Sequence, residues 1–129
     1  MQFDPLADAL SKIDTYDRAG KKEVFIRPTS NLIQDVLATL QKAGYIGEFE
    51  RVEDAQGGQF RVQLLGRINK CAVIKPRQPT KVTEIDEFEK RFLPAVNFGI
   101  LVLTTPLGVM TQREAIENHV GGRLLAYVY

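Results

Sequence analysis

The hydrophobic period of this chain changes from that of a helix to that of a strand part-way along, and this change limits the folds open to it. In the segments 5–16 and 31–43, apolar residues recur three and four positions apart, as on the buried side of a helix. In 45–54 and 57–65, apolar and polar residues alternate, which predicts an antiparallel hairpin. With a short strand at 21–28, this order predicts an open α/β sandwich.

The starts of the two predicted helices are marked by residues that can cap them. Asp4 suits the N-cap of the first helix, and Pro5 suits its first position, where a missing N–H costs nothing. Ser30 or Asn31 can cap the second helix in the same way. Pro28 is expected to end the strand between the helices. These assignments divide the start of the chain into α, β and α segments.

The rest of the chain predicts shorter elements. In order, we expect a strand at 71–76, a linker with a short helix or turn at 77–97, a buried strand at 98–103, a turn at 104–108, a helix at 110–122 and a final strand at 123–129. Thr111 and Glu114 form a capping box for that helix, and Gly121 and Gly122 are expected to end it. At 129 residues, the chain is expected to form one compact unit or two small lobes sharing a core.

Charge is segregated along the chain, although its net value is only +1. Residues 61–81 hold six Lys or Arg and no acid, whereas residues 84–89 hold four acids and no base. Segregation of this kind can produce a basic face that a neutral total conceals, and such a face attracts nucleic acid. A solvated charged surface without a partner is the simpler interpretation of the same pattern.

The sequence offers little for catalysis, metal binding or membrane insertion. It has one cysteine, Cys71, and one histidine, His119, which are too few for an internal disulfide or an unaided zinc site. Cys71 lies in an apolar run that suits a core residue, and His119 lies near a predicted helix end that suits a capping residue. No apolar stretch approaches the length of about 18 residues that is needed to cross a bilayer, and we expect neither a secretory signal nor a transit peptide. We therefore expect a cytoplasmic protein that is not an enzyme and has no catalytic residues, metal or cofactor.

The turn at 104–108, with the sequence TTPLG, is the strongest local candidate for a binding surface. The hydroxyls of Thr104 and Thr105 and the backbone N–H groups around Gly108 can bind phosphate oxygens and ribose hydroxyls, and the N-terminus of the following helix adds positive potential. Arg123 and the preceding basic segment could supply phosphate contacts beside it. Thr, Pro and Gly are also common in turns that bind nothing.

Six blocks of the sequence resemble, in the same order, those of the small-subunit ribosomal protein S8 family. The blocks are DPLADAL, GYIGEFE, INKCAVIKPR, FGILVLTT, GVMTQREA and GGRLLAYVY, which together span residues 4–129. One such block would be only suggestive, whereas six in order at fitting spacings point to a family. The block INKCAVIKPR and the ending YVY resemble the archaeal branch, with the eukaryotic cytosolic form next.

The resemblance implies a two-lobed α+β (α/β) fold. Residues 1–76 would form an N-terminal α-β-α-β-β open sandwich, to which the strand at 71–76 adds a further β, and residues 77–129 a small β-sheet with one α-helix. It also implies direct binding to the central domain of small-subunit ribosomal RNA, support of the assembly of the subunit's platform, contact with neighbouring small-subunit proteins, and a monomer off the ribosome. Two alternatives stay open: a translational repressor that binds a ribosomal-protein messenger RNA, and a non-ribosomal protein-interaction module.

The residues to which the resemblance assigns RNA contact lie in both lobes. The most characteristic contact loop of the family is Ser/Thr-Thr-Ser/Thr-x-Gly, which matches residues 104–108 here. Pro106 stands at its third position and has neither an N–H nor a hydroxyl, so it can only shape the turn. We therefore expect RNA contact from Thr104, Thr105 and Gly108. The further candidates are Asp4, Pro5, Ser30, Asn31, Lys75, Arg77, Gly121, Gly122 and Arg123.

Overall fold

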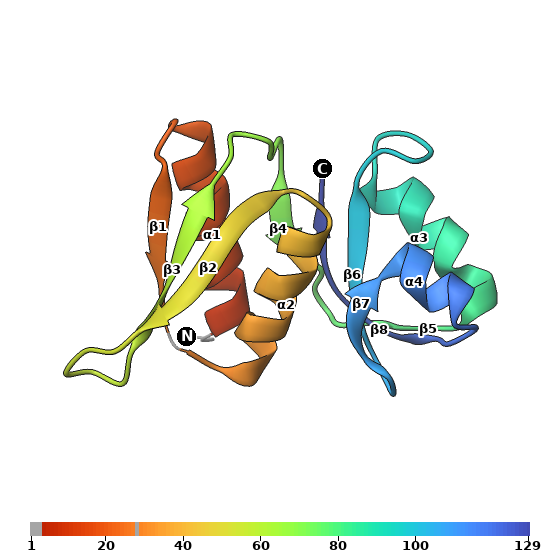
Figure 1. Ribbon diagram of the computed structural model, residues 1–129. Helices are drawn as coiled ribbons and strands as arrows, with labels where there is room; N and C mark the ends of the chain where they lie inside the picture. The colour runs from red at the N-terminus through yellow and green to blue at the C-terminus, as the bar shows by residue number, and fades with distance from the viewer. Residues whose placement is uncertain (1–3, 28) are drawn as a thin grey trace. The chain divides into compact units, whose positions relative to one another are not determined.

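Figure 1 shows the computed structural model of the protein, which describes residues 4–27 and 29–129. The chain divides into two compact units, Met1–Cys71 and Ala72–Tyr129. This division comes before residue 76, where the first lobe was expected to end.

The described part of the first unit contains two helices and three strands. They are α1 (Pro5–Arg18), β1 (Glu23–Ile26), α2 (Asn31–Lys42), β2 (Ile46–Val52) and β3 (Gln59–Leu64). The strands form an antiparallel sheet in the order β1-β3-β2, so that the last strand lies in the middle. The predicted α-β-α-β-β order is confirmed. Pro28, the expected end of the first strand, lies outside the described residues.

An apolar layer joins the helices of the first unit to one side of its sheet. Its side chains follow the predicted periods of three or four on the helices and two on the strands. They are Leu6, Ala9, Leu10 and Ile13 from α1, Ile33, Val36, Leu37 and Leu40 from α2, Val24 and Ile26 from β1, Ile46 from β2, and Phe60, Val62 and Leu64 from β3. The intervening residues of β3, Arg61 and Gln63, are exposed on the other side.

The second unit, whose residues are all described, is built around a five-stranded sheet. Its elements are β4 (Cys71–Val73), which begins at the boundary, β5 (Pro79–Thr80), the 3-10 helix η1 (Val82–Glu84), α3 (Ile85–Phe92), β6 (Ile100–Thr105), β7 (Gly108–Thr111), α4 (Gln112–Glu117) and β8 (Gly122–Val128). The strand order is β4-β8-β6-β7, and β5 also pairs with β8. β6 and β7 form a hairpin, and β8 lies antiparallel to β6 on its other side. The α+β class is confirmed.

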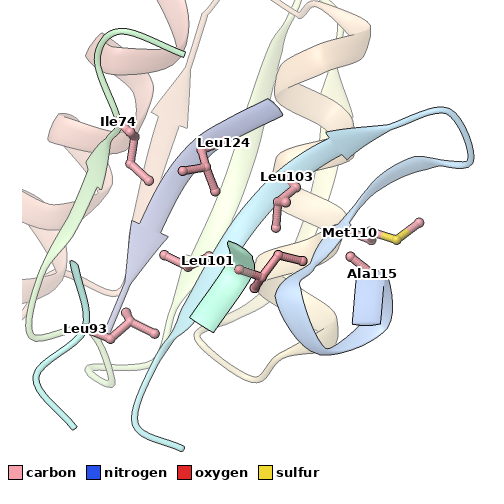
Figure 2. Close-up of a cluster of buried hydrophobic side chains, with 8 residues drawn as sticks. Ile74, Leu93, Leu101, Leu103, Met110, Ala115 and Leu124 are labelled. Carbon is pink, nitrogen blue, oxygen red and sulfur yellow. The ribbon is translucent and has the colours of Figure 1, made fainter. Parts of the chain in front are cut away.

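Figure 2 shows the apolar cluster that joins the helices of the second unit to this sheet. Its buried members are Ile74, Ile85, Leu93, Leu101, Leu103, Met110, Ala115 and Leu124. Leu101 and Leu103 lie two residues apart on β6 and therefore point to the same side of the sheet. Gln112, the first residue of α4, is only 1% exposed, and its Oε1 accepts a hydrogen bond from the backbone N–H of Leu101 at 2.8 Å. This bond ties α4 to β6.

Two features of the second unit differ from the expectations. The strand expected at 71–76 is shorter and joins the second sheet, where the N–H of Ile74 continues the pairing by donating to the carbonyl of Leu125 at 2.9 Å. The hydrophobic period predicts a strand but does not identify the sheet that it joins. The unit also contains two α-helices, whereas the resemblance implied one. The additional helix is α3, which forms in the segment 77–97 where a short helix or turn was expected.

The helix expected at 110–122 is shorter as well. Its first residues instead pair with β6 as β7, so that α4 begins at Gln112. The predicted capping box is confirmed, because Thr111 and Glu114 each accept a hydrogen bond from the other's backbone N–H at 3.3 Å. The helix ends at Glu117 with Asn118 as its C-cap, and His119 adopts the left-handed conformation with φ of 54°. The prediction that glycines 121 and 122 end this helix is therefore wrong.

Candidate nucleic-acid interface

The turn singled out by the sequence is the tip of the β6–β7 hairpin. Thr105 pairs with Gly108 across the hairpin, so that only Pro106 and Leu107 form the connection. Proline holds φ at about −65° and thereby excludes the primed turns, which need a positive φ at that position. Gly108, with φ of 122°, supplies a positive φ after the turn instead. The pairing of β6 with β7 therefore continues up to the two-residue turn.

The two threonines at this tip have different environments. The hydroxyl of Thr105 donates to the carbonyl of Gly108 at 2.8 Å and accepts from the N–H of Leu107 at 3.1 Å. Thr105 therefore shapes the turn, and its only donor is occupied. Thr104 is half-buried, and its hydroxyl has no hydrogen-bond partner among residues 4–27 and 29–129. Thr104 is the threonine whose hydroxyl can bind a ligand without breaking the turn.

Open space surrounds Gly108, whereas Gly121 and Gly122 are tightly enclosed. A Cβ atom on Gly108 would have no neighbour within 4 Å. A Cβ atom on Gly122 would lie 2.2 Å from the carbonyl oxygen of Thr104, and one on Gly121 would lie 2.4 Å from that of Thr80. These two glycines allow β8 to lie close to β6 and β5. Gly108 instead leaves the backbone of the tip open to approach.

Arg123 lies directly beside the hairpin. Across the sheet it is paired with Thr104 of β6 and with Pro79 of β5. Its side chain is exposed, and its Nη1 donates to the backbone carbonyl of Arg77 at 3.3 Å. Arg77 is exposed too, as is Lys75 in the same connection between β4 and β5. The structure thus brings a free hydroxyl and exposed cationic side chains together in the second unit.

In the first unit, the predicted site residues serve the ends of helices. The carboxylate of Asp4 accepts hydrogen bonds from two N–H groups of the first turn of α1 at 3.1 and 3.2 Å, and Pro5 is the first helical residue. The hydroxyl of Ser30 accepts from a first-turn N–H of α2 at 3.2 Å. Asn31 is the first residue of α2 and is exposed. The predicted caps are confirmed, and a ligand at either helix start would compete with them.

The two residues considered for catalysis are poorly placed for it. Cys71 is buried, and this burial, together with the negative charges of Asp14 and Asp17, raises the pKa of its thiol far above the ordinary value. His119 is an exposed residue at the end of a helix. Among residues 4–27 and 29–129, no group of three His, Cys, Asp or Glu side chains could hold a metal ion. None of the helices in these same ranges has the length and apolarity needed to cross a membrane.

Two residues that shape the hairpin were not found from the sequence. Gln112 ties α4 to β6, but a polar residue at a helix start gives no local sign that it is buried. Leu107 is 63% exposed at the tip itself. Its position in the sequence, between a proline and a glycine in a predicted turn, could have indicated that this apolar side chain is exposed.

Comparison with known proteins places the chain among ribosomal proteins. The family described as Ribosomal protein S8 matches residues 4–129. The small ribosomal subunit protein uS8 of Methanococcoides burtonii is 57% identical over 127 residues, which are 98% of this chain and 98% of that protein. The match includes the hairpin tip and both helix starts.

Proposed function

The chain belongs to the ribosomal protein S8 family, and we propose that it is a structural constituent of the small ribosomal subunit that binds directly to the central domain of small-subunit ribosomal RNA. It is a ribosomal protein and not an enzyme, and we place it in the cytoplasmic ribosome. Neighbouring small-subunit proteins are its further proposed partners, and off the ribosome it is proposed to be a monomer. The observation that best supports RNA binding is the open hairpin tip with an arginine beside it.

The hairpin tip offers groups that suit an RNA helix of irregular shape. The major groove of A-form RNA is too deep and narrow for side chains, so proteins bind its backbone, its 2′-hydroxyls and its splayed bases. The hydroxyl of Thr104 can donate to a phosphate oxygen and accept from a 2′-hydroxyl. A Cβ atom at Gly108 would meet nothing within 4 Å, so an RNA backbone could approach the protein backbone closely there. Thr105 contributes by holding the turn in shape.

Basic side chains beside the hairpin supply the electrostatic part of the proposed binding. Arg123, Arg77 and Lys75 are exposed and can contact phosphates. Each such contact releases a counterion, so that this part of the affinity falls as salt rises. The positive potential expected from the following helix is small, since α4 has only six residues.

The remaining candidates are proposed to contact RNA in addition to their structural roles. Gly121 and Gly122 keep β8 against the hairpin and expose backbone rather than side chain beside Thr104. The helix starts formed by Asp4 with Pro5, and by Ser30 with Asn31, offer the polar side chains of capping residues.

The proposed function is tested by titrating the protein with two RNA hairpins of equal length at several salt concentrations. One hairpin copies the irregular central-domain helix and the other is unrelated. We expect the cognate hairpin to stay bound as salt rises, and the double variant Thr104→Ala/Thr105→Ala to lose this preference. Equal binding to both hairpins that disappears with modest salt would show only non-specific attraction to phosphates, and the proposal would fail.

A further inference from the structure

Six basic side chains gather at the end of the first unit where its two helices finish. They come from three segments: the end of α1 and the connection to β1, the end of α2, and the loop after β3. We call this surface the basic end, and its members are Arg18, Lys21, Lys22, Lys42, Arg67 and Lys70. The α1–β1 connection and the loop after β3 lie at the upper end of the first unit in Figure 1.

Hydrogen bonds hold the three segments of the basic end together. The N–H of Leu64, at the end of β3, donates to the carbonyl of Lys22 at 2.8 Å. A guanidinium N–H of Arg67 donates to the carbonyl of Gly44, just after α2, at 3.2 Å. The three segments are therefore neighbours in space although about 50 positions separate Arg18 from Lys70.

A buried carboxylate fixes the loop that carries Arg67. Asp17 of α1 is only 5% exposed, and it accepts hydrogen bonds from the backbone N–H groups of Gly66 at 2.9 Å and Ile68 at 3.1 Å. These two N–H groups point inward, and the side chain of Arg67 between them is exposed. The bond to Gly44 uses one of its five guanidinium donors, so that the others can meet a partner.

The basic end keeps an excess of positive charge, because its six cations outnumber Asp14 and Asp17 of α1 and the two acids nearest Lys22, Glu23 and Glu48. Asp14 pairs with Arg18 at 2.6 Å and, like Asp17, is buried and bonded within the fold. Lys21 and Lys22 are exposed, and neither has an ion pair within the described residues. Favourable interaction with helix dipoles can account for Arg18 and Lys42, which lie at helix ends. It does not account for Lys21, Lys22 and Arg67, which lie outside the helices.

At the opposite end of the first unit, positive charges are balanced by negative ones. There the cations pair with acids in the same region: Arg27 with Asp54, and Arg51 with Glu53. Asp4 caps α1 at that end. The 14 residues of α1 separate the two ends by about 21 Å. A phosphate backbone would be attracted to the basic end far more than to the capped end.

We propose that the basic end binds the sugar–phosphate backbone of an RNA duplex in small-subunit ribosomal RNA, as a contact separate from the β6–β7 hairpin. This proposal rests on the proposed function, because it assumes that ribosomal RNA is the partner. Lysine and arginine side chains on a fixed surface bind phosphates without reading bases. The basic end should therefore add affinity and salt dependence but no sequence preference.

The test compares the full-length double variant Lys21→Ala/Lys22→Ala with Lys90→Ala/Arg91→Ala, which removes the same charge from α3. Two RNAs are titrated: a transcript of the whole central domain, and the short hairpin that copies its irregular helix. On the long transcript, the Lys21/Lys22 variant should bind about tenfold more weakly at about 0.1 M salt, with a salt slope smaller by about two. The Lys90/Arg91 variant should bind both RNAs like the wild type, and thermal unfolding checks that all three proteins are equally folded.

Two results would overturn the proposal. Equal losses for the two double variants on the long transcript would mean that only net charge matters. Equal losses of affinity by the Lys21/Lys22 variant for the long transcript and for the short RNA hairpin would mean that both lysines contact the same RNA helix as the β6–β7 hairpin. They would then not form a second contact. Failure of the proposed function has a different signature, because the wild type would then not prefer the cognate hairpin to an unrelated one.

Discussion

The described residues include two antiparallel hairpins whose polar groups are arranged in opposite ways. In the β2–β3 hairpin, Asp54 accepts hydrogen bonds from the N–H groups of Gln56 at 2.8 Å and Gly58 at 2.9 Å, and it pairs with Arg27. In the β6–β7 hairpin, which has a two-residue tip, the hydroxyl of Thr104 has no partner among the described residues. The first loop satisfies its own polar groups, and the second leaves some of them available.

This difference indicates which hairpin can bind. A hydrogen bond to a ligand adds little when it replaces a bond already made within the protein, and more when the group was previously in contact only with water. The β2–β3 loop therefore has less to offer a ligand than the β6–β7 tip, where we propose that RNA binds. The predictions below alter one hairpin and use the other as its control.

The largest effect is expected from Gly122→Ala in β8, which should displace β6 at Thr104, next to the tip of the β6–β7 hairpin. The new Cβ would lie 2.2 Å from the backbone oxygen of Thr104, and backbone cannot move aside cheaply. We expect a loss of about 3 kcal/mol in the free energy of unfolding, measured with urea. Gly47→Ala at the base of the β2–β3 hairpin is the control, since its Cβ would meet only the flexible end of Gln63. Equal losses for the two variants would contradict this account.

A smaller effect is expected from Thr105→Val, which removes two hydrogen bonds within the tip while keeping the side-chain volume. Because the hydroxyl joins the carbonyl of Gly108 to the N–H of Leu107, the variant should lose about 1 kcal/mol of stability and bind the cognate RNA hairpin more weakly. Urea unfolding and RNA titration measure the two effects. The control Thr29→Val, which removes a longer 3.3 Å bond to Gly57 in the other hairpin, should leave RNA binding unchanged.

The smallest effect is expected from Asp54→Asn in the β2–β3 loop. Backbone N–H groups of Gly58 and Gln56, and then Arg27, lower the pKa of Asp54 below its ordinary value of 3.8. A carboxylate whose pKa is lower in the folded than in the unfolded protein stabilises the fold at pH values above its unfolded-state pKa. This stabilisation is lost as the pH falls through its folded-state pKa. As the pH falls below about 4, the variant should therefore lose slightly less stability than the wild type does. Acid unfolding of both proteins measures this difference. RNA binding at neutral pH that fell with this variant would contradict the division between the hairpins.

The first unit could be predicted well because its signals are local. Asp4 and Ser30 cap helices through bonds to residues two or three positions away, and the apolar stripes that follow them need only a period. The strand at Cys71–Val73 was found by the same period, but its neighbour β8 lies about 50 positions further on. Pairing over such a distance leaves no trace in a local pattern.

The candidate site shows the same limit more sharply. The sequence marks Thr104 and Thr105 as equivalent, and only the geometry of the tip separates the hydroxyl that holds the turn from the one that is free. Gly121 and Gly122 suggested a helix end, because that is where glycine is common in sequence. Their close approach to β5 and β6 is visible only once the sheet is assembled.

The central claim, that the open tip of the β6–β7 hairpin recognises RNA, is tested most directly with Thr104→Val. This substitution keeps the volume and removes a hydroxyl that makes no bond within the described protein, so stability should stay within about 0.5 kcal/mol of the wild type. Affinity for the cognate hairpin should fall about tenfold relative to an unrelated hairpin at the same salt concentration. An unchanged ratio between the two RNAs in a variant that folds normally would contradict the claim.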